Sequence, residues 1–312
     1  MFVKIIINKV YSFDVKLFCM VLLVTGSSGF VGSHLTNSLI SKKYSVLGLA
    51  HQKTKKSTLK TIIKDISKVQ SSTFTQDLSC IIHAAAITDL KKCHDSPVES
   101  IKTNVFGTLN MLEIARKKDS KFVYVSTSHV YGVPEKIPIK EKHVTNPTSI
   151  YASSKLEGEH FCEMYSKLYG MDVSVIRLFS VYGPQSPSYN VISKIILQLL
   201  TSNVIRLGDI TPKRDFIFIS DVVDAIELIM KKTKDFSIFN VGSGKSLSIQ
   251  DVCNMLKKIS KNDAKVLSTK SNFRKNDAQN IVADISKIKK LEWKPKILIK
   301  DGLKLTFERT VI

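Results

Sequence analysis

Two scarcities narrow the function of this 312-residue chain. No apolar run reaches the roughly 18 residues that a membrane-spanning helix needs, so we expect no membrane partner. The five cysteines form no CxxC pair and their number is odd, a pattern typical of reduced, structural thiols. We therefore predict a cytoplasmic protein without a metal site.

Arginine is also scarce. The net charge is +20, but arginine occurs at only six positions, so lysine supplies almost all of the excess. A strongly basic chain can bind nucleic acid. No aromatic–basic motif or helix-turn-helix pattern accompanies the charge, and we expect an anionic small substrate and no nucleic acid. Because arginine grips a phosphate through two parallel hydrogen bonds, each of the six becomes a candidate ligand.

The first half of the chain alternates between apolar runs and segments of helical periodicity. The predicted strands cover residues 21–26, 45–50, 59–66, 80–86, 122–128 and 173–180. The predicted helices cover 30–41, 97–118 and 150–169. This alternation predicts an α/β fold, a Rossmann-type doubly wound parallel sheet.

The pattern loosens after residue 180. Further strands are predicted at 215–220 and 236–242, and helices at 248–260 and 285–291. We interpret residues 20–178 as a Rossmann NAD(P)-binding domain to which residues 216–243 return. A smaller C-terminal substrate-binding lobe then combines residues 179–215 and 244–312. Residues 1–19, which precede a second methionine, are interpreted as an N-terminal extension and not as a membrane anchor.

A glycine-rich turn follows the first predicted strand. The segment "TGSSGFVG" places Gly26, Gly29 and Gly32 between a buried strand and an amphipathic helix. Side chains at these positions would keep a pyrophosphate from the amide groups at the helix N-terminus, where the helix dipole favours anions. The predicted cofactor-binding residues of this turn are Gly26, Ser28, Gly29, Phe30, Val31 and Gly32.

The end of the second strand bears on the choice of cofactor. Folds that prefer NAD usually have an acidic residue there, which binds the ribose 2′-hydroxyl. Here Ala50 and His51 are followed by Lys53, Lys55 and Lys56. The cofactor is therefore NAD or NADP. The basic side chains of His51 and the lysines that follow favour NADP, and the alternative interpretation is that these lysines form a solvated loop. Asp65, after the third strand, is predicted to meet the adenine.

A phenol and an ammonium are spaced for proton transfer. Tyr151 and Lys155 are four residues apart on a predicted helix and share a face. A phenol with a pKa near 10 is a poor base, and a nearby ammonium favours the phenolate. Lowering that pKa by about 3 units corresponds to roughly 4 kcal/mol. With the hydroxyl of Thr127, the pair would suit alcohol oxidation beside a nicotinamide.

These segments together resemble one family. From about residue 21 to 308 the chain is similar to the extended short-chain dehydrogenases/reductases that act on nucleotide-sugars. The resemblance rests on "TGSSGFVGSHL", "IIHAAA", "NVFGTLNMLE", "VSTSHVYG", "YASSKLEGE", "RLFSVYGPQ", "KRDFIFISDVVDAI" and "FNVGSGKSLSI".

The resemblance implies roles for individual residues. Tyr151 would be the acid/base, Lys155 would orient the nicotinamide ribose, and Thr127 would bind the substrate hydroxyl. Asn104 would brace these hydrogen bonds, and Arg214 and Arg274 would clamp the nucleotide diphosphate. Further cofactor contacts are implied at Ile66, Ala84, Ala85 and Ala86, further substrate contacts at Ser128, His129 and Ser180, and a homodimer as the assembly.

Two departures from the family bear on the reaction. Ser180 stands where asparagine is common, and His129 stands where the sugar-dehydratase branches carry a glutamate. We therefore expect a nucleotide-sugar epimerase that acts at C4 through a 4-keto intermediate. A 4-keto-sugar reductase is the first alternative and a 4,6-dehydratase the second. A non-catalytic dinucleotide-binding scaffold and a nucleic-acid binder are the alternatives from other classes.

Overall fold

The computed structural model describes residues 21–52, 59–269 and 278–311. Several predictions fall on positions outside the described residues: the extension over residues 1–19, the basic residues Lys53, Lys55 and Lys56, and the proposed phosphate ligand Arg274.

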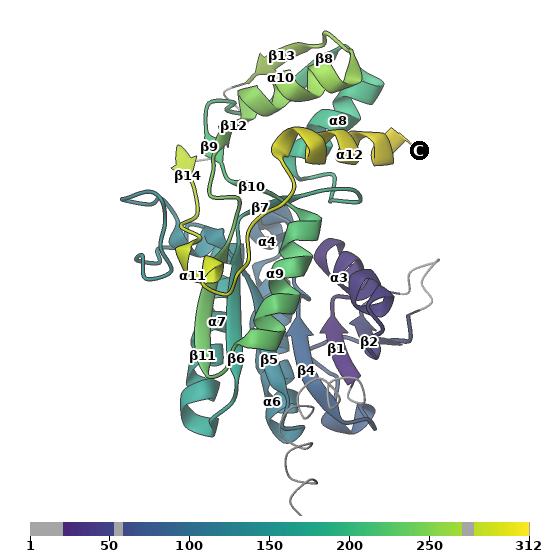
Figure 1. Cartoon of the computed structure of the whole chain (residues 1–312), viewed down its shortest axis with the longest axis vertical. Coiled ribbons are helices and arrows are strands. Elements are labelled where there is room, and N and C mark those ends of the chain that lie inside the picture. The colour runs from purple at the N-terminus through teal and green to yellow at the C-terminus, as the bar shows by residue number, and fades with distance from the viewer. Residues whose placement is uncertain (1–20, 53–58, 270–277, 312) are drawn as a thin grey trace, which may run out of the picture.

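A sheet of seven parallel strands forms the base of the molecule (Figure 1). Its strands are β1 (Val21–Thr25), β2 (Val46–Ala50), β3 (Thr61–Ile63), β4 (Leu78–His83), β5 (Lys121–Thr127), β6 (Val173–Leu178) and β11 (Phe236–Val241). They lie in the order β11-β6-β5-β4-β1-β2-β3. The order confirms the prediction of a Rossmann-type parallel sheet.

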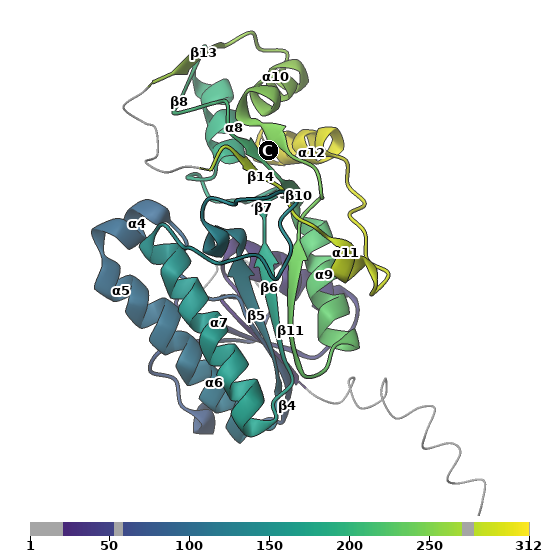
Figure 2. The same ribbon diagram turned by 90° about the vertical axis from the view of Figure 1, so that its left-hand side faces the viewer.

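Both faces of the sheet are covered, which explains why its strands are continuous apolar runs. Successive side chains point to opposite faces: Leu22 and Val24 join one core cluster, and Leu23 joins the other. Helices α3 (Phe30–Ser41) and α9 (Ile219–Lys232) cover the first face. Helices α6 (Gly107–Lys117) and α7 (Ile150–Tyr169) cover the second, as Figure 2 shows from the side.

The single helix expected at 97–118 is interrupted. After α4 (Leu90–Asp95), the chain forms α5 (Pro97–Ile101), a π-helical segment η2 (Lys102–Phe106) and then α6. The correction matters because Asn104 lies in the π-helical segment, and such segments occur frequently at functional sites. Hydrophobic periodicity cannot distinguish a π-turn from the surrounding α-helix.

Two strands are shorter than predicted. β3 is limited to Thr61–Ile63, and β4 ends at His83, because β1 ends where Thr25 pairs with His83. Ala84, Ala85 and Ala86 therefore lie in the loop beyond the carboxyl end of the strand, and not within it.

The strand expected at 173–180 is also divided. β6 ends at Leu178, and β7 (Ser180–Tyr182) leaves the sheet to pair with β10 (Phe216–Phe218). Above these lies what we call the small lobe, which has its own core (Figure 1). Its elements are α8 (Val191–Thr201), β8 (Val204–Leu207), α10 (Ile249–Ser260), β13 (Lys265–Ser268) and α12 (Ile299–Val311).

Short strands connect the sheet with the small lobe. β9 (Lys213–Arg214) lies between β12 (Leu247–Ser248) and β14 (Asn280–Ile281). The remaining short elements are the 3-10 turns η1 (Ser71–Thr73) and η3 (Ser128–Tyr131) and the helix α11 (Ser286–Lys289). In the main sheet the strand order reverses between β1 and β4, and ligands of doubly wound sheets bind beyond the carboxyl ends of strands at such a point.

Candidate active site

The glycine turn leaves the N-terminus of α3 open to an anion. Gly29 is the N-cap residue, no side chain caps the helix, and its first turn contains no acidic residue. The amide groups of Phe30, Val31 and Gly32 are the ones that a helix leaves without an intrahelical partner. A pyrophosphate would find hydrogen-bond donors and a favourable dipole here.

The glycines are also required by close packing. Gly26 has φ +66°, and a Cβ atom there would lie 2.8 Å from the backbone of Ala85. A Cβ atom on Gly32 would lie 2.1 Å from the carbonyl oxygen of Gly26. The turn therefore fits a dinucleotide phosphate group in both its shape and its donors.

The residues predicted to bind the adenosine part of the cofactor lie in different environments. His51 is exposed directly after β2. Asp65 is half-buried, and its Oδ1 accepts hydrogen bonds from the amide of Ser67 at 2.9 Å and its hydroxyl at 2.8 Å. These bonds hold the pKa of Asp65 below its usual value. The side chain of Ile66, in contrast, is buried in the core on the α6 side.

A buried histidine that we did not single out from the sequence joins the glycine turn to the helices behind it. His83 Nδ1 lies 2.7 Å from Thr25 Oγ1, and His83 Nε2 lies 3.0 Å from Thr108 Oγ1. Thr25 Oγ1 also accepts a hydrogen bond from the amide of Ala85. Burial lowers the pKa of His83 to about 3, so the imidazole is neutral and structural at physiological pH. In the sequence it is a lone histidine in an apolar run.

The structure brings the predicted reacting residues together. Thr127 is the last residue of β5, and Tyr151 is the second residue of α7, whose N-cap Ser149 accepts a hydrogen bond from Ala152. The hydroxyl of Thr127 lies near the phenol of Tyr151 and favours its ionised form. One turn further along the helix, Lys155 Nζ lies 4.0 Å from the ring centroid of Tyr124.

Burial dominates the electrostatics of this cluster. It raises the pKa of Tyr151, although the nearby hydroxyl of Thr127 opposes the shift. It also lowers the pKa of Lys155 to about 7, with Cys162 and Glu159 opposing. We expected a lowered pKa for Tyr151 because the sequence reveals the ammonium and not the degree of burial. In the folded protein that expectation is wrong.

Asn104 connects this cluster to the loop after β4. Its side-chain oxygen accepts a hydrogen bond from the Ile87 amide at 2.8 Å, and its amide donates to the Ile87 carbonyl and to Ser154 Oγ, both at 3.0 Å. Ser154 in turn donates to the carbonyl of Tyr151. The side chain of Asn104 thus braces the first turns of α7.

A buried ion pair, also absent from our predictions, supports the cluster from behind. The guanidinium of Arg177 donates to both oxygens of Glu159, which lies one turn after Lys155 on α7. Ser126, beside Thr127, donates to Glu159 Oε1 at 2.5 Å. The pair ties β5, β6 and α7 together and uses Arg177 for structure, which removes it from the candidate phosphate ligands.

The predicted substrate contacts have different environments. Ser128 is buried, whereas His129 is exposed and its ring centroid lies 6.1 Å from that of Tyr151. Ser180 begins β7 and donates its amide to the carbonyl of Asp215. The structure thus places the imidazole, and not a carboxyl group, beside the reacting phenol.

Arg214 lies where the small lobe meets the sheet. Its Nη1 donates to the carbonyl groups of Lys213 and Ala278, at 2.9 and 2.8 Å. The following residue, Asp215, is buried and accepts hydrogen bonds from the amides of Ser243, Gly244 and Ala283. These bonds fix the position of β9 between its neighbours.

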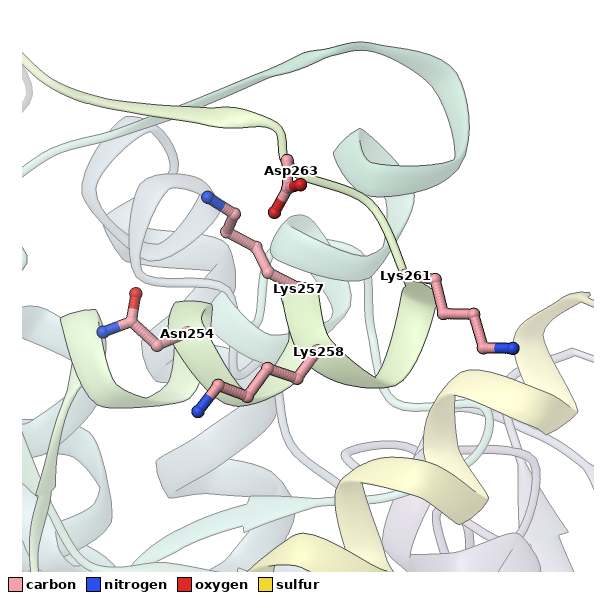
Figure 3. Close-up of a pocket in the computed structure, with 5 residues that line it drawn as sticks. All are labelled: Asn254, Lys257, Lys258, Lys261 and Asp263. Atoms are coloured by element: carbon pink, nitrogen blue, oxygen red, sulfur yellow. The ribbon is translucent and has the colours of Figure 1, made fainter.

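A separate hollow of about 500 Å³ lies on α10, in the small lobe (Figure 3). In the close-up Lys257 extends toward Asp263, whereas Lys258 and Lys261 point away from it. These lysines occupy the C-terminal turn of α10, where cations compensate the helix dipole. We interpret the hollow as a solvated helix face. It is lined by Asn254, Lys257, Lys258, Lys261 and Asp263.

Comparison with known proteins decides the family. The model of the NAD dependent epimerase/dehydratase family matches residues 22–242. The chain belongs to this family. The match confirms the resemblance inferred from the motifs.

The relatives are sugar-nucleotide enzymes. A putative UDP-glucose 4-epimerase of Methanocaldococcus jannaschii is 33% identical over 91% of this chain and 96% of its own length. The structure of a UDP-glucose 4-epimerase from Thermotoga maritima with UDP-glucose has a TM-score of 0.87 and 29% identity, and the match covers 94% of this chain and 99% of that one.

A further solved structure contains a nicotinamide cofactor. The UDP-glucuronic acid 4-epimerase from Bacillus cereus, in complex with UDP-glucuronic acid and NAD, has a TM-score of 0.86 and 30% identity. The match covers 93% of this chain and 98% of that one. Solved structures with such likeness over nearly their whole length share their fold with this chain.

Two searches within residues 21–52, 59–269 and 278–311 give negative results. No helix there is long and apolar enough to cross a bilayer. No group of three or more histidine, cysteine, aspartate or glutamate side chains in the same residues could hold a metal ion.

Proposed function

We propose that this protein is a UDP-hexose 4-epimerase that works with a bound nicotinamide cofactor. The observation that carries the proposal is the cluster of Thr127, Tyr151 and Lys155 beyond the carboxyl end of β5, on the same edge of the sheet as the glycine turn. The sugar-nucleotides named for the similar epimerases support the choice of uridine diphosphate.

The residues divide the reaction between them. When bound, the cofactor supplies reversible hydride transfer. Tyr151 takes the proton of the C4 hydroxyl, and Thr127 hydrogen-bonds to the same oxygen. Tyr151 accepts this proton as the phenolate and becomes the neutral phenol, and the N-terminus of α7 favours that phenolate. After the 4-keto sugar turns over, Tyr151 returns the proton to the carbonyl oxygen, and the C4 configuration is inverted.

The neighbouring residues argue against elimination of water. A 4,6-dehydratase needs an acid and a base besides the tyrosine, and the turn after Thr127, which consists of Ser128, His129, Val130 and Tyr131, contains no carboxyl group. A hydroxyl cannot serve as that base, and imidazole would have to replace the carboxyl group that dehydratases carry.

Substrate and cofactor are held by the residues predicted from the motifs. Arg214 would hold the UDP diphosphate together with Arg274, with Ser180 and Ser128 along the sugar, and Asn104 would keep α7 in place. Arginine can bind a diphosphate with parallel charge-assisted hydrogen bonds. The lack of a carboxylate at the end of β2 supports NADP as the preferred cofactor, with His51 beside the 2′-phosphate.

We further propose a homodimer whose interface includes α5 and α7, which lie side by side in Figure 2. Large apolar side chains are exposed on α5, η2 and α7: Val98 is 79% exposed, Phe106 59% and Leu168 67%. Val98 and Phe106 also line a hollow of about 580 Å³ with Ile101 and the aliphatic parts of Lys68 and Lys102. Apolar patches of this kind mark protein–protein contacts.

The dimer is tested by sedimentation. Phe106→Glu and Leu168→Glu should yield monomers, whereas Leu298→Glu, which changes an equally exposed leucine near α12, should leave the dimer intact. A monomeric wild-type protein would refute the proposed assembly. The cytoplasmic location stays a prediction; the described cysteines, Cys80, Cys93, Cys162 and Cys253, are free thiols.

The function is tested by incubating the protein with UDP-glucose, UDP-galactose, UDP-glucuronic acid and UDP-N-acetylglucosamine in the presence of NAD or NADP. Products are followed by mass and proton NMR. An epimerase changes the C4 configuration without a change of mass. A gain of two hydrogens would identify the reductase, and the loss of one water would identify the dehydratase; either result would replace the proposed function.

A further inference from the structure

One hydrogen bond joins the small lobe to the loop after β4. The hydroxyl oxygens of Thr88 and Tyr189 lie 2.7 Å apart, and either can be the donor. Thr88 follows Ile87 in the loop beyond β4, whereas Tyr189 precedes α8. The two residues are 101 positions apart in the sequence, so only the folded chain brings them together.

This contact lies at the reacting residues. Thr88 is the neighbour of Ile87, whose amide and carbonyl groups are both held by Asn104. Asn104 in turn binds Ser154, on the turn of α7 that contains Tyr151. Tyr189 is also near enough to Tyr151 to disfavour ionisation of the Tyr151 phenol.

Both partners are held in place by their own segments. On the small-lobe side, the carbonyl of Pro184 lies 2.9 Å from His34 Nε2, Ser186 Oγ lies 2.5 Å from Ser193 Oγ, and Asn190 donates its amide to Pro187. On the other side, Asp89 caps α4 directly after Thr88. The two hydroxyls are thus preorganised by the backbone around them.

The exposure of Tyr189 shows that its ring is not packed within a hydrophobic core. The residue is 44% exposed, although its hydroxyl is bonded across the two parts of the molecule. A hydroxyl both donates and accepts hydrogen bonds. A sugar hydroxyl can therefore accept a hydrogen bond from one of the two residues and donate one to the other, so that neither hydroxyl loses a partner when the Thr88–Tyr189 bond opens.

We infer that Thr88 and Tyr189 form a sugar-binding pair, in which the two hydroxyls bind one hydroxyl group of the hexose and the tyrosine ring limits the size of the sugar. The inference rests on the proposed function and deepens it, because it names residues that select the hexose. Diphosphate binding involves other residues, so the pair should act on the sugar and not on the nucleotide.

The test uses two variants that remove one hydroxyl each, Thr88→Val and Tyr189→Phe. Substrates are the UDP-hexose that the wild-type enzyme converts best and a set of its analogues, each lacking one sugar hydroxyl. Each variant should raise the KM for the full substrate by about 3- to 10-fold with a smaller change in kcat. One analogue lacks the hydroxyl that the pair binds. With wild-type protein its KM should exceed that of the full substrate, whereas with either variant the two KM values should be equal.

Two measurements complete the design. Calorimetry should find the affinity for UDP alone unchanged in both variants, and Tyr169→Phe, which alters an exposed tyrosine at the far end of α7, should behave as wild type. Unchanged KM values and unchanged discrimination among the analogues would overturn the inference. A wild-type protein that converts no UDP-hexose would refute the proposed function. The inference would then be decided by binding alone, from the affinity for UDP-hexose relative to UDP in the variants and in wild-type protein.

Discussion

The glycine turn before α3 and the cluster around Tyr151 lie at the same edge of the sheet, but they differ in what the chain presents there. At the glycine turn side chains are excluded: a Cβ atom on Gly26 or Gly32 would meet backbone atoms at 2.8 or 2.1 Å. Backbone amides are left to bind phosphate. At the cluster, the proposed chemistry depends on the side chains of Thr127, Tyr151 and Lys155. The glycine turn should therefore tolerate no added side chains, and the cluster should not tolerate the removal of its functional groups.

The largest effect should follow the loss of the Tyr151 oxygen. Tyr151→Phe removes the group that transfers the proton and leaves the ring, so turnover should fall by about 10²- to 10⁴-fold. Cofactor affinity, measured by calorimetry, should stay as in wild type because the glycine turn is untouched. Near-normal turnover in this variant would show that the cluster does not carry the reaction.

The next largest effect should concern the nucleotide-sugar. Arg214→Ala should weaken its binding by about 1.5–3 kcal/mol, and Arg274→Ala by a similar amount, because each loses a charge-assisted contact. The dissociation constant is measured by calorimetry with Arg206→Ala, which alters an exposed arginine on β8, as the matched control. If Arg214→Ala and Arg274→Ala both bind normally, the diphosphate lies elsewhere.

Burial of Lys155 should make stability depend on pH. Its pKa is about 7 in the folded protein, whereas the ordinary pKa of a lysine side chain is 10.5. Between these values the unfolded chain binds more protons, so stability should rise with pH by up to about 1.4 kcal/mol per pH unit. Urea unfolding of nucleotide-free protein at pH 7.5 and 8.5 should show a smaller rise in Lys155→Met. Equal rises in the two proteins would contradict the lowered pKa of Lys155.

A smaller effect is expected in the choice of cofactor. If His51 and the lysines after β2 bind a 2′-phosphate, NADP should bind more tightly than NAD, and added salt should reduce the difference. Titrations at low and high ionic strength measure both quantities, and His51→Ala should narrow the preference. Equal or tighter binding of NAD would leave the lysines as a solvated loop.

The smallest effect should come from His129. The wild-type protein should form no 4-keto-6-deoxy product, and His129→Ala should retain a substantial fraction of the epimerase activity. The exposed imidazole lies beside the ring of Tyr151, and the proposed proton transfer does not involve it. A dehydrated product that is formed by wild-type protein and lost in His129→Ala would make the imidazole the missing catalyst.

Local patterns in the sequence were sufficient for the fold class and for part of the site. The strands are buried on both faces and therefore appear as apolar runs, and Tyr151 and Lys155 share a face because one helix contains both. The positions of Thr127 and the glycine turn follow from the ends of predicted strands. Periodicity did not reveal the π-helical turn at Asn104 or the end of β4 at His83.

By itself the sequence determined which residues can do the chemistry, because the glycine turn, the phenol–ammonium pair and the strand periodicity each depend on residues close together in the chain. The tertiary structure decided their surroundings. The Glu159–Arg177 pair, the bonds of His83 and the Thr88–Tyr189 contact join residues that are 18 to 101 positions apart. Burial, which reversed the expected pKa shift of Tyr151, is likewise a property of packing, since desolvation depends on everything that surrounds a group and not on its neighbours in sequence.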